Sequence, residues 1–242
     1  MGKNIRANGV NHLALSTSNM KEQIEFFTDV LGMELIALYW MHGVEGCWHG
    51  FLRLNDASAV AFVFNPENAS APVSIGGSHA GHAGGASAPG TMQHLALNVD
   101  RLVDLLNMRD RIRSRGVNCI GPLDHGMGHS IYFSGPENLT LEISTYGDAA
   151  HPIGAKDWVD PEVMELAGIS NEELARYVKP AAYAGQGGTV PQPGYETSKY
   201  HAAMPEEVLR NLYAMPDAIV TETMSEPTPP SKMNHDDRDA KR

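Results

Sequence analysis

Two histidines occupy matching places in two similar stretches of the chain, NHLALSTS at 11–18 and QHLALNVD at 93–100. Side chains alternate faces along a strand, so the leucines of each stretch share one face and the histidine shares the other with a small alanine. The leucine face suits a covering helix. We therefore expect His12 and His94 on the concave, open face of a sheet, where the alanines leave room for a ligand.

A carboxylate joins this set from LTLEIST at 139–145, where Glu142 alternates with leucine and isoleucine. Burying an ionised glutamate without a partner costs several kcal/mol, and a divalent cation offsets that cost better than neutral imidazoles do. Two histidines and one carboxylate are the ligands of non-haem Fe(II) oxygenases, and similar sets hold Mn(II) or Zn(II). A single strand histidine is more often a hydrogen-bonded core residue. Because the histidine is repeated, we predict a metal site of His12, His94 and Glu142, with Fe(II) favoured.

The elements that must position these residues also repeat along the chain. Each histidine stretch is followed by an amphipathic helix and then by three short strand-like runs, which is a βαβββ order. The first helix has Ser18 or Asn19 as N-cap and Gly32 as its stop, and the second has Asp100 as N-cap. Neither copy can bury its apolar side alone. The predicted fold class is therefore α+β, with two paired βαβββ modules forming a cupped mixed sheet around a metal site.

Composition divides the chain into five segments. We expect a first module at 8–65, a Gly/Ala/Ser-rich connector at 66–91, a second module at 92–146, a helical and irregular C-terminal arm at 147–215 and a partly disordered tail at 216–242.

Charge and cysteine content exclude several classes of function. The 18 basic and 29 acidic residues give a net charge of −11, with no basic patch for a nucleic acid. Cys47 and Cys119 match neither a disulfide framework nor a zinc knuckle. The opening residues lack a signal peptide, and no run of 18 apolar residues occurs. We expect a cytoplasmic protein with no membrane or nucleic-acid partner, and the paired modules and long arm favour a homo-oligomer.

With this arrangement, residues 8–146 resemble the vicinal oxygen chelate superfamily of glyoxalases, bleomycin resistance proteins and extradiol dioxygenases. That family places metal ligands on the first and last strands of each module, which implies His12, His94, Glu142 and a fourth position. In SAVAFVF, the stretch that corresponds to LTLEIST, we expect Phe62 at the fourth position, where it cannot coordinate a metal. Glyoxalase-type isomerases bring a second carboxylate there. The chain therefore most resembles the type I extradiol ring-cleavage dioxygenases, which hold Fe(II) with two histidines and one glutamate.

The stretch HGMGHSIYFSGPENLTLE at 125–142 is similar to the extradiol dioxygenase signature. The resemblance implies catalytic roles for His125, which would hydrogen-bond substrate or oxygen, and for Tyr132, which would donate to a diol oxygen. The alternatives are a surface-turn histidine and a packed strand tyrosine.

The first module departs from that family. FLRLNDASAVAFV has Ala57 and Ser58 where the family has a pair of histidines, the second of which handles protons. Ring cleavage would then need another histidine, for which the candidates are His125, His129, His79 and His82. The two connector histidines are more often simply solvated.

Aromatic residues of the first module suggest a substrate wall. We expect Phe62, Trp48 and His49 to bind substrate, although such residues are more often part of the core. The predicted function is an Fe(II)-dependent extradiol dioxygenase that cleaves a catechol-like aromatic diol with O₂. The alternatives are a metal-dependent isomerase, lyase or hydrolase of the glyoxalase scaffold that stabilises an enediolate or a related oxyanion, and a non-catalytic small-ligand-binding module, which generally lacks metal ligands.

Overall fold

The computed structural model describes residues 4–154, 158–197 and 200–230. Its contacts divide the chain into two compact units. One unit, Gly9–Ser170, contains both predicted modules, and the other joins the N-terminal residues to the chain from Asn171 onward. Every predicted site residue lies in the first of these units.

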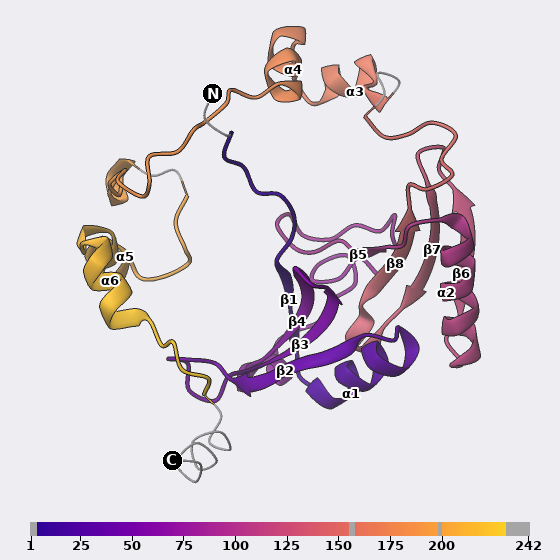
Figure 1. Cartoon of the computed structure of the whole chain (residues 1–242), viewed down its shortest axis with the longest axis horizontal. Coiled ribbons are helices and arrows are strands. Elements are labelled where there is room, and N and C mark those ends of the chain that lie inside the picture. Colours follow the sequence, from indigo (N-terminus) through magenta and orange to yellow (C-terminus); the bar gives the residue numbers. More distant parts are fainter. Residues whose placement is uncertain (1–3, 155–157, 198–199, 231–242) are drawn as a thin grey trace. The chain divides into compact units, whose positions relative to one another are not determined.

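The first module has the predicted order of one strand, a helical segment and three strands (Figure 1). Its elements are β1 (His12–Thr17), α1 (Met20–Glu25), a π-helical turn η1 (Phe26–Val30), β2 (Glu34–Trp40), β3 (Trp48–Asn55) and β4 (Ser58–Phe64). Asn19 caps α1, because its side-chain oxygen accepts a hydrogen bond from the backbone N–H of Glu22 at 3.3 Å. Gly32 follows the helical segment with a φ of +77°, a left-handed conformation that glycine adopts without strain. Asn19 and Gly32 are therefore confirmed as the start and stop.

The second module repeats this order. Its elements are β5 (Leu95–Asn98), α2 (Leu102–Ser114), β6 (Cys119–Asp124), β7 (His129–Ser134), a short 3₁₀ turn η3 (Pro136–Asn138) and β8 (Thr140–Thr145). The prediction of Asp100 as N-cap is wrong, because the cap position is Arg101 and its side chain makes no capping bond. The backbone N–H of Leu102 instead donates to the Asp148 carboxylate at 3.2 Å. A residue beyond the last strand of the module thus stabilises the start of its helix.

Each module forms a four-stranded mixed sheet, in the order β1-β4-β3-β2 for the first and β5-β8-β7-β6 for the second. The pairs β1–β4 and β5–β8 are parallel, and the other pairs are antiparallel. The predicted α+β class with two βαβββ modules is confirmed.

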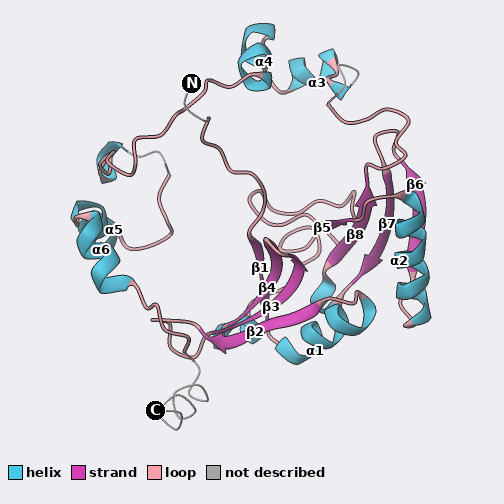
Figure 2. Cartoon of the chain, viewed as in Figure 1, coloured by secondary structure: helices cyan, strands magenta, loops and turns pink. Residues whose placement is uncertain are grey.

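One apolar core lies between the two modules. Its fully buried members include Phe27 and Phe62 from the first module and Leu105, Ile112 and Leu141 from the second. Each such side chain contributes about 1.5–3 kcal/mol relative to an exposed position. Helix α2 lies along the second sheet and packs on β6, β7 and β8 (Figure 2). Because the core takes the leucine face of each sheet, the histidine faces turn away from it.

A hydrogen-bonded clamp, formed by Glu137 with Thr17, Ser18 and Gln23, joins the modules. The Glu137 carboxylate accepts bonds from the Thr17 hydroxyl at 2.6 Å, the Ser18 backbone N–H at 2.8 Å and hydroxyl at 2.5 Å, and the Gln23 amide at 2.9 Å. Burial alone raises the pKa of this carboxyl, but the hydrogen bonds outweigh burial and leave the pKa below its ordinary value. The clamp therefore favours an ionised Glu137.

The connector at 66–91 contains the 3₁₀ turn η2 (Pro66–Ser70) and an isolated bridge between Ile75 and His79. Beyond the modules, the chain forms α3 (Pro161–Leu166), α4 (Asn171–Val178), a 3₁₀ turn η5 (Tyr195–Thr197), α5 (Glu206–Ala214) and α6 (Asp217–Met224). Helix α6 lies in the segment predicted to be partly disordered, and residues 231–242 of that segment lie outside the described residues. Among the described residues, every helix is too short or too polar to cross a membrane.

Candidate metal and substrate site

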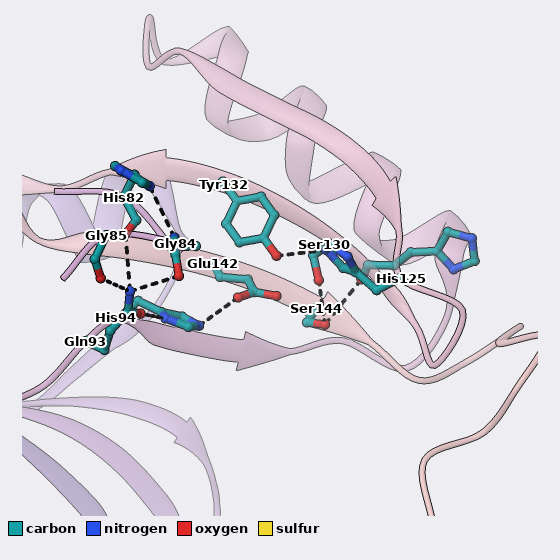
Figure 3. A network of polar contacts seen from close by, with 12 residues as sticks. His82, Gly84, Gly85, Gln93, His94, His125, Ser130, Tyr132, Glu142 and Ser144 are labelled. Atoms are coloured by element: carbon teal, nitrogen blue, oxygen red, sulfur yellow. Dashed lines mark hydrogen bonds and ion pairs between the residues drawn. The ribbon is translucent and has the colours of Figure 1, made fainter. Parts of the chain in front are cut away.

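His94 and Glu142 come from separate elements of the second module and meet at its outward face (Figure 3). His94 directly precedes β5, and Glu142 lies in the middle of β8 opposite Ala96. Nε2 of His94 lies 2.9 Å from Oε2 of Glu142, and the glutamate side chain is only 10% exposed. Two of the three predicted metal ligands are therefore adjacent within one chain.

Gln93 presents its side-chain oxygen to Nδ1 of His94. The side-chain nitrogen of Gln93 donates to the backbone carbonyl oxygens of Ala83 at 2.8 Å and Gly85 at 3.0 Å. It also lies 3.3 Å from the carbonyl oxygen of His82. Carbonyl oxygens only accept, so this orientation of the amide is fixed and its oxygen faces Nδ1 of His94. Nδ1 must then be the donor. In the neutral ring, Nε2 is left with an unshared pair that points at Glu142.

A pocket of about 420 Å³ opens beside this pair. Its lining includes His94 and Glu142 together with His125, Tyr132 and Ser144. The volume is within the range of small-ligand pockets, about 300–1,000 Å³. The metal-ligand candidates and the two residues predicted to act on substrate thus share one cavity.

His125 and Tyr132 form a hydrogen-bonded pair in this pocket. Nε2 of His125 lies 2.9 Å from the Tyr132 hydroxyl, and the rings meet edge to face. Tyr132 stands opposite Glu142 in the β7–β8 ladder. Burial raises the pKa of the Tyr132 phenol, and the nearby charge of Glu142 raises it further. Tyr132 is therefore a protonated donor at neutral pH, with His125 available to relay a proton.

His12 lies on the matching face of the first sheet. Its Nδ1 is 2.8 Å from the side-chain oxygen of Asn11, and its ring packs 5.5 Å from that of Phe51. Within the described ranges, no group of three or more histidine, cysteine, aspartate or glutamate side chains lies close enough to hold a metal ion. A single chain therefore brings together His94 and Glu142 but does not bring His12 to them.

Strand register corrects the predicted counterpart of Glu142. Ala96 pairs with Glu142 in the second module, and Ala14 pairs with Ala61 in the first. Ala61, rather than Phe62, is therefore the equivalent residue, and the prediction was wrong by one position. A shift of one residue reverses the face of a strand. Phe62 is accordingly fully buried, with its ring 5.0 Å from that of Phe27, and cannot touch substrate in this position.

The other two residues of the predicted substrate wall lie on opposite faces. Trp48 shares the face of the core and packs against Phe64 at 5.1 Å between ring centroids. His49 lies on the face of His12, next to Tyr39 and Phe51. Burial lowers the pKa of His49, and proximity to His12 lowers it further. Of the predicted wall, only His49 remains on a ligand-bearing face.

The remaining histidine candidates do not line the pocket beside Glu142. His129 alternates with the pocket residues Ser130 and Tyr132, so it points to the other side of β7, with Nε2 3.8 Å from the Asp124 carboxylate. His79 lines a different cavity of about 380 Å³, between β1 and the connector. His82 reaches the site through its backbone, since its carbonyl faces Gln93.

Sequence reasoning missed Gln93 and Glu137. A signal for Gln93 is visible, because an amide residue precedes the histidine in both NHLALSTS and QHLALNVD. The sequence contains no comparable signal for Glu137, whose partners lie more than 110 positions away.

Comparison with known proteins identifies relatives of the two-module unit. Residues 9–143 match the family model described as Glyoxalase/Bleomycin resistance protein/Dioxygenase superfamily. No curated protein matches the chain.

Solved structures with similarity include a glyoxylase/bleomycin resistance protein/dioxygenase domain from Frankia sp. EAN1pec, with 14% identity, a TM-score of 0.45, and coverage of 58% of this chain and 98% of that one. An integron cassette protein, HFX_CASS4, from the Halifax Harbour Sewage Outfall metagenome has 20% identity, a TM-score of 0.42, and coverage of 57% and 99%. Lactoylglutathione lyase from Agrobacterium tumefaciens has 14% identity, a TM-score of 0.40, and coverage of 57% and 94%.

Proposed function

The chain belongs to the glyoxalase/bleomycin resistance protein/dioxygenase superfamily, and from that membership we propose that it is an Fe(II)-dependent extradiol-type dioxygenase acting on a catechol-like aromatic diol. The observation that carries the proposal is the 2.9 Å contact between His94 and Glu142, beside the hydrogen-bonded His125–Tyr132 pair. Together these residues offer metal ligands and proton-handling groups to one small pocket.

The contact between His94 and Glu142 fits a cation. Because Gln93 occupies Nδ1 as an acceptor, the Nε2 atom of a neutral His94 has no hydrogen for Glu142. Two electron-rich atoms at 2.9 Å repel each other unless a proton or a metal ion lies between them. Nε2 of His94 and the Glu142 carboxylate would hold a divalent cation, which would remove that repulsion and offset the charge of the buried carboxylate. The donor set thus fits Fe(II), and equally Mn(II) or Zn(II).

His12 of a second copy of the chain supplies the third ligand in this proposal. His12, Ala14 and Ser16 are all exposed, so the histidine face of β1 is open in the single chain. Ala61 offers no carboxylate there, which gives a set of two histidines and one glutamate when this face meets that of a second sheet. A symmetric dimer would then hold two sites, or one metal ion per chain.

Mixing variants tests the shared site. His12→Ala and Glu142→Gln each lose one ligand, and each homodimer should bind no metal tightly. After co-refolding, half of the dimers are mixed and contain one complete site, so about a quarter of all sites should recover. No recovery, with both variants folded, would exclude a site built from two chains.

The chain's own residues position the diol and move its protons. When bound, Fe(II) supplies the electron transfer that joins an aromatic diol to O₂, and both oxygen atoms enter the ring-opened product. Tyr132 donates a hydrogen bond to one diol oxygen, and His125 accepts a proton directly or through Tyr132. The hydroxyls of Ser130 and Ser144, 3.0 Å apart, give the pocket a polar floor.

A metal-dependent isomerase or lyase is the second candidate. It is favoured by Ala57, in the β3–β4 turn, and Ser58, the first residue of β4, which stand where the extradiol resemblance expects a proton-handling histidine. The same metal and Tyr132 would then stabilise an enediolate instead of promoting oxygen chemistry.

Anaerobic loading separates these functions. The protein is purified without oxygen, assayed for bound metal, loaded with Fe(II), and given a panel of catechols and then air. A ring-opened product, seen by its absorbance, supports the dioxygenase. Tight Fe(II) binding with no product from any diol would overturn that function and direct the assay to enediolate-forming substrates. Stoichiometric capture of a diol by metal-free protein would favour the non-catalytic binding module.

A further inference from the structure

The residue before each candidate metal histidine carries a side-chain amide, and both amides meet Nδ1 of their neighbour. Asn11 contacts His12 at 2.8 Å, and the Gln93 oxygen contacts His94. Both pairs lie at the start of a first strand of a module, since His12 is the first residue of β1 and His94 directly precedes β5. The same contact, between an amide side chain and Nδ1 of the following histidine, therefore occurs at matched positions of the two modules.

Without such an acceptor, His94 and Glu142 would satisfy each other. A neutral histidine in water favours a hydrogen on Nε2, and that hydrogen would point at the Glu142 carboxylate 2.9 Å away. The resulting bond would occupy both ligand atoms and compete with a metal ion. An acceptor at Nδ1 draws the single hydrogen to the far side of the ring and leaves Nε2 free.

We propose that Asn11 and Gln93 are positioning residues that hold His12 and His94 in the form with hydrogen on Nδ1, so that each Nε2 is ready to bind a metal. This inference rests on the proposed function, because it takes Nε2 as the ligand atom. Supporting partners of this kind typically change metal affinity by about 10–100-fold.

The Gly-rich connector gains a role in the site through Gln93. Gln93 can present its oxygen to His94 only while its nitrogen donates to the carbonyls of residues 83 and 85 (Figure 3). Gly85 permits this approach, because a Cβ there would lie 2.1 Å from the Ala80 carbonyl oxygen. The connector therefore acts on the metal site through backbone groups, while its histidines do not.

Nitrogen NMR of the histidine rings tests the proposal in metal-free protein. The pH is raised until each ring keeps one hydrogen, and the ring ¹⁵N shifts then show which nitrogen bears it. We expect Nδ1 for His94 in the natural chain. We expect Nε2 in Gln93→Met, which has similar volume and no polar atom. Asn11→Leu should cause the same change at His12.

Zinc affinity gives a second, independent measurement. Zn(II) is a diamagnetic probe, and its affinity measured by calorimetry should fall about 10–100-fold in Gln93→Met. Gln23→Met is the matched control, because it removes an amide of the Glu137 clamp without touching His94. It should lower stability and leave both the ring shifts and zinc affinity unchanged.

The two proposals fail in different ways. A hydrogen on Nε2 of His94 in the natural chain, or unchanged shifts and zinc affinity in Gln93→Met, would overturn the positioning role. If instead the natural chain keeps its Nδ1 hydrogen but binds no Zn(II), Fe(II) or Mn(II), the positioning role stands and the proposed function fails.

Discussion

Replacing Glu137 with glutamine should weaken the contact between the two modules. In the natural chain, one carboxylate oxygen accepts from the Ser18 backbone N–H and hydroxyl, and the other accepts from the Thr17 hydroxyl and the Gln23 amide. A glutamine keeps one oxygen and turns its NH₂ group toward the other two donors. A hydroxyl can rotate and accept from that group, but a backbone N–H or an amide NH₂ cannot.

The expected loss of stability follows from the number of donors that lose an acceptor. In either orientation of the new amide, one hydrogen-bond donor loses its acceptor in a partly buried position. An unsatisfied donor of this kind costs about 1–3 kcal/mol, so Glu137→Gln should lower the free energy of unfolding by that amount. Glu25→Gln is a suitable control, since the Glu25 pair with Lys21 is 64% and 84% exposed and should contribute less than about 1 kcal/mol.

Lowering the pH should further distinguish the natural chain from the Glu137→Gln variant. The pKa of Glu137 is lowered in the folded protein, so its contribution to stability is complete above the unfolded pKa of about 4.3 and is lost as pH falls through the folded pKa. The glutamine variant lacks this component, and the stability gap between the chains should narrow below about pH 4. Urea unfolding at a series of pH values measures both effects. Equal unfolding midpoints at pH 7, or a gap that does not narrow in acid, would refute the clamp.

Changes at the metal pair, the pocket tyrosine and the connector have separate expected outcomes. Glu142→Gln removes the ligand charge and should lower Zn(II) affinity more than about 100-fold by calorimetry; unchanged affinity would remove Glu142 from the ligand set. Tyr132→Phe should leave metal affinity intact and reduce kcat about 10²–10³-fold in steady-state assays of whichever diol is turned over, because a donor to developing charge is lost. Gly85→Ala would place a Cβ 2.1 Å from the Ala80 oxygen, which moves the carbonyl that holds Gln93. Zn(II) affinity should then fall several-fold while the urea midpoint barely moves. Unchanged Zn(II) affinity would show that the connector does not act on the metal site.

The faces of the site residues were predictable because strand alternation is a local rule. Alternation alone placed His94 and Glu142 on the outward side of the second sheet, and the structure brings them to 2.9 Å. The predicted counterpart of Glu142 was one residue too far along the strand. Aligning SAVAFVF with LTLEIST end to end already places Ala61 opposite Glu142, and the ladder selects the same residue over Phe62. One position separates a ligand-bearing face from the core.

Long-range partners could not be read from the sequence. Asp148 caps a helix that begins 46 positions earlier, and Glu137 reaches α1 from a turn of the other module. A sequence shows that a residue has acceptor atoms, but only the packing of distant elements shows which donors need them. The same difficulty applies to His12, because its predicted partners, His94 and Glu142, are not reached within one chain.

The two histidine faces differ in a way that favours pairing between unlike sheets. The second face carries a carboxylate and the Tyr132 hydroxyl, whereas the first carries His12 among the rings of Tyr39, His49 and Phe51. Meeting of two first faces would bring no carboxylate to a cation. Meeting of two second faces would provide two carboxylates and would leave His12 without a role. A contact between one first face and one second face would give two histidines, one carboxylate and an aromatic surface for a planar substrate. Alanine rather than a carboxylate at position 61 is thus consistent with a site whose charge comes from one module and whose apolar wall comes from the other.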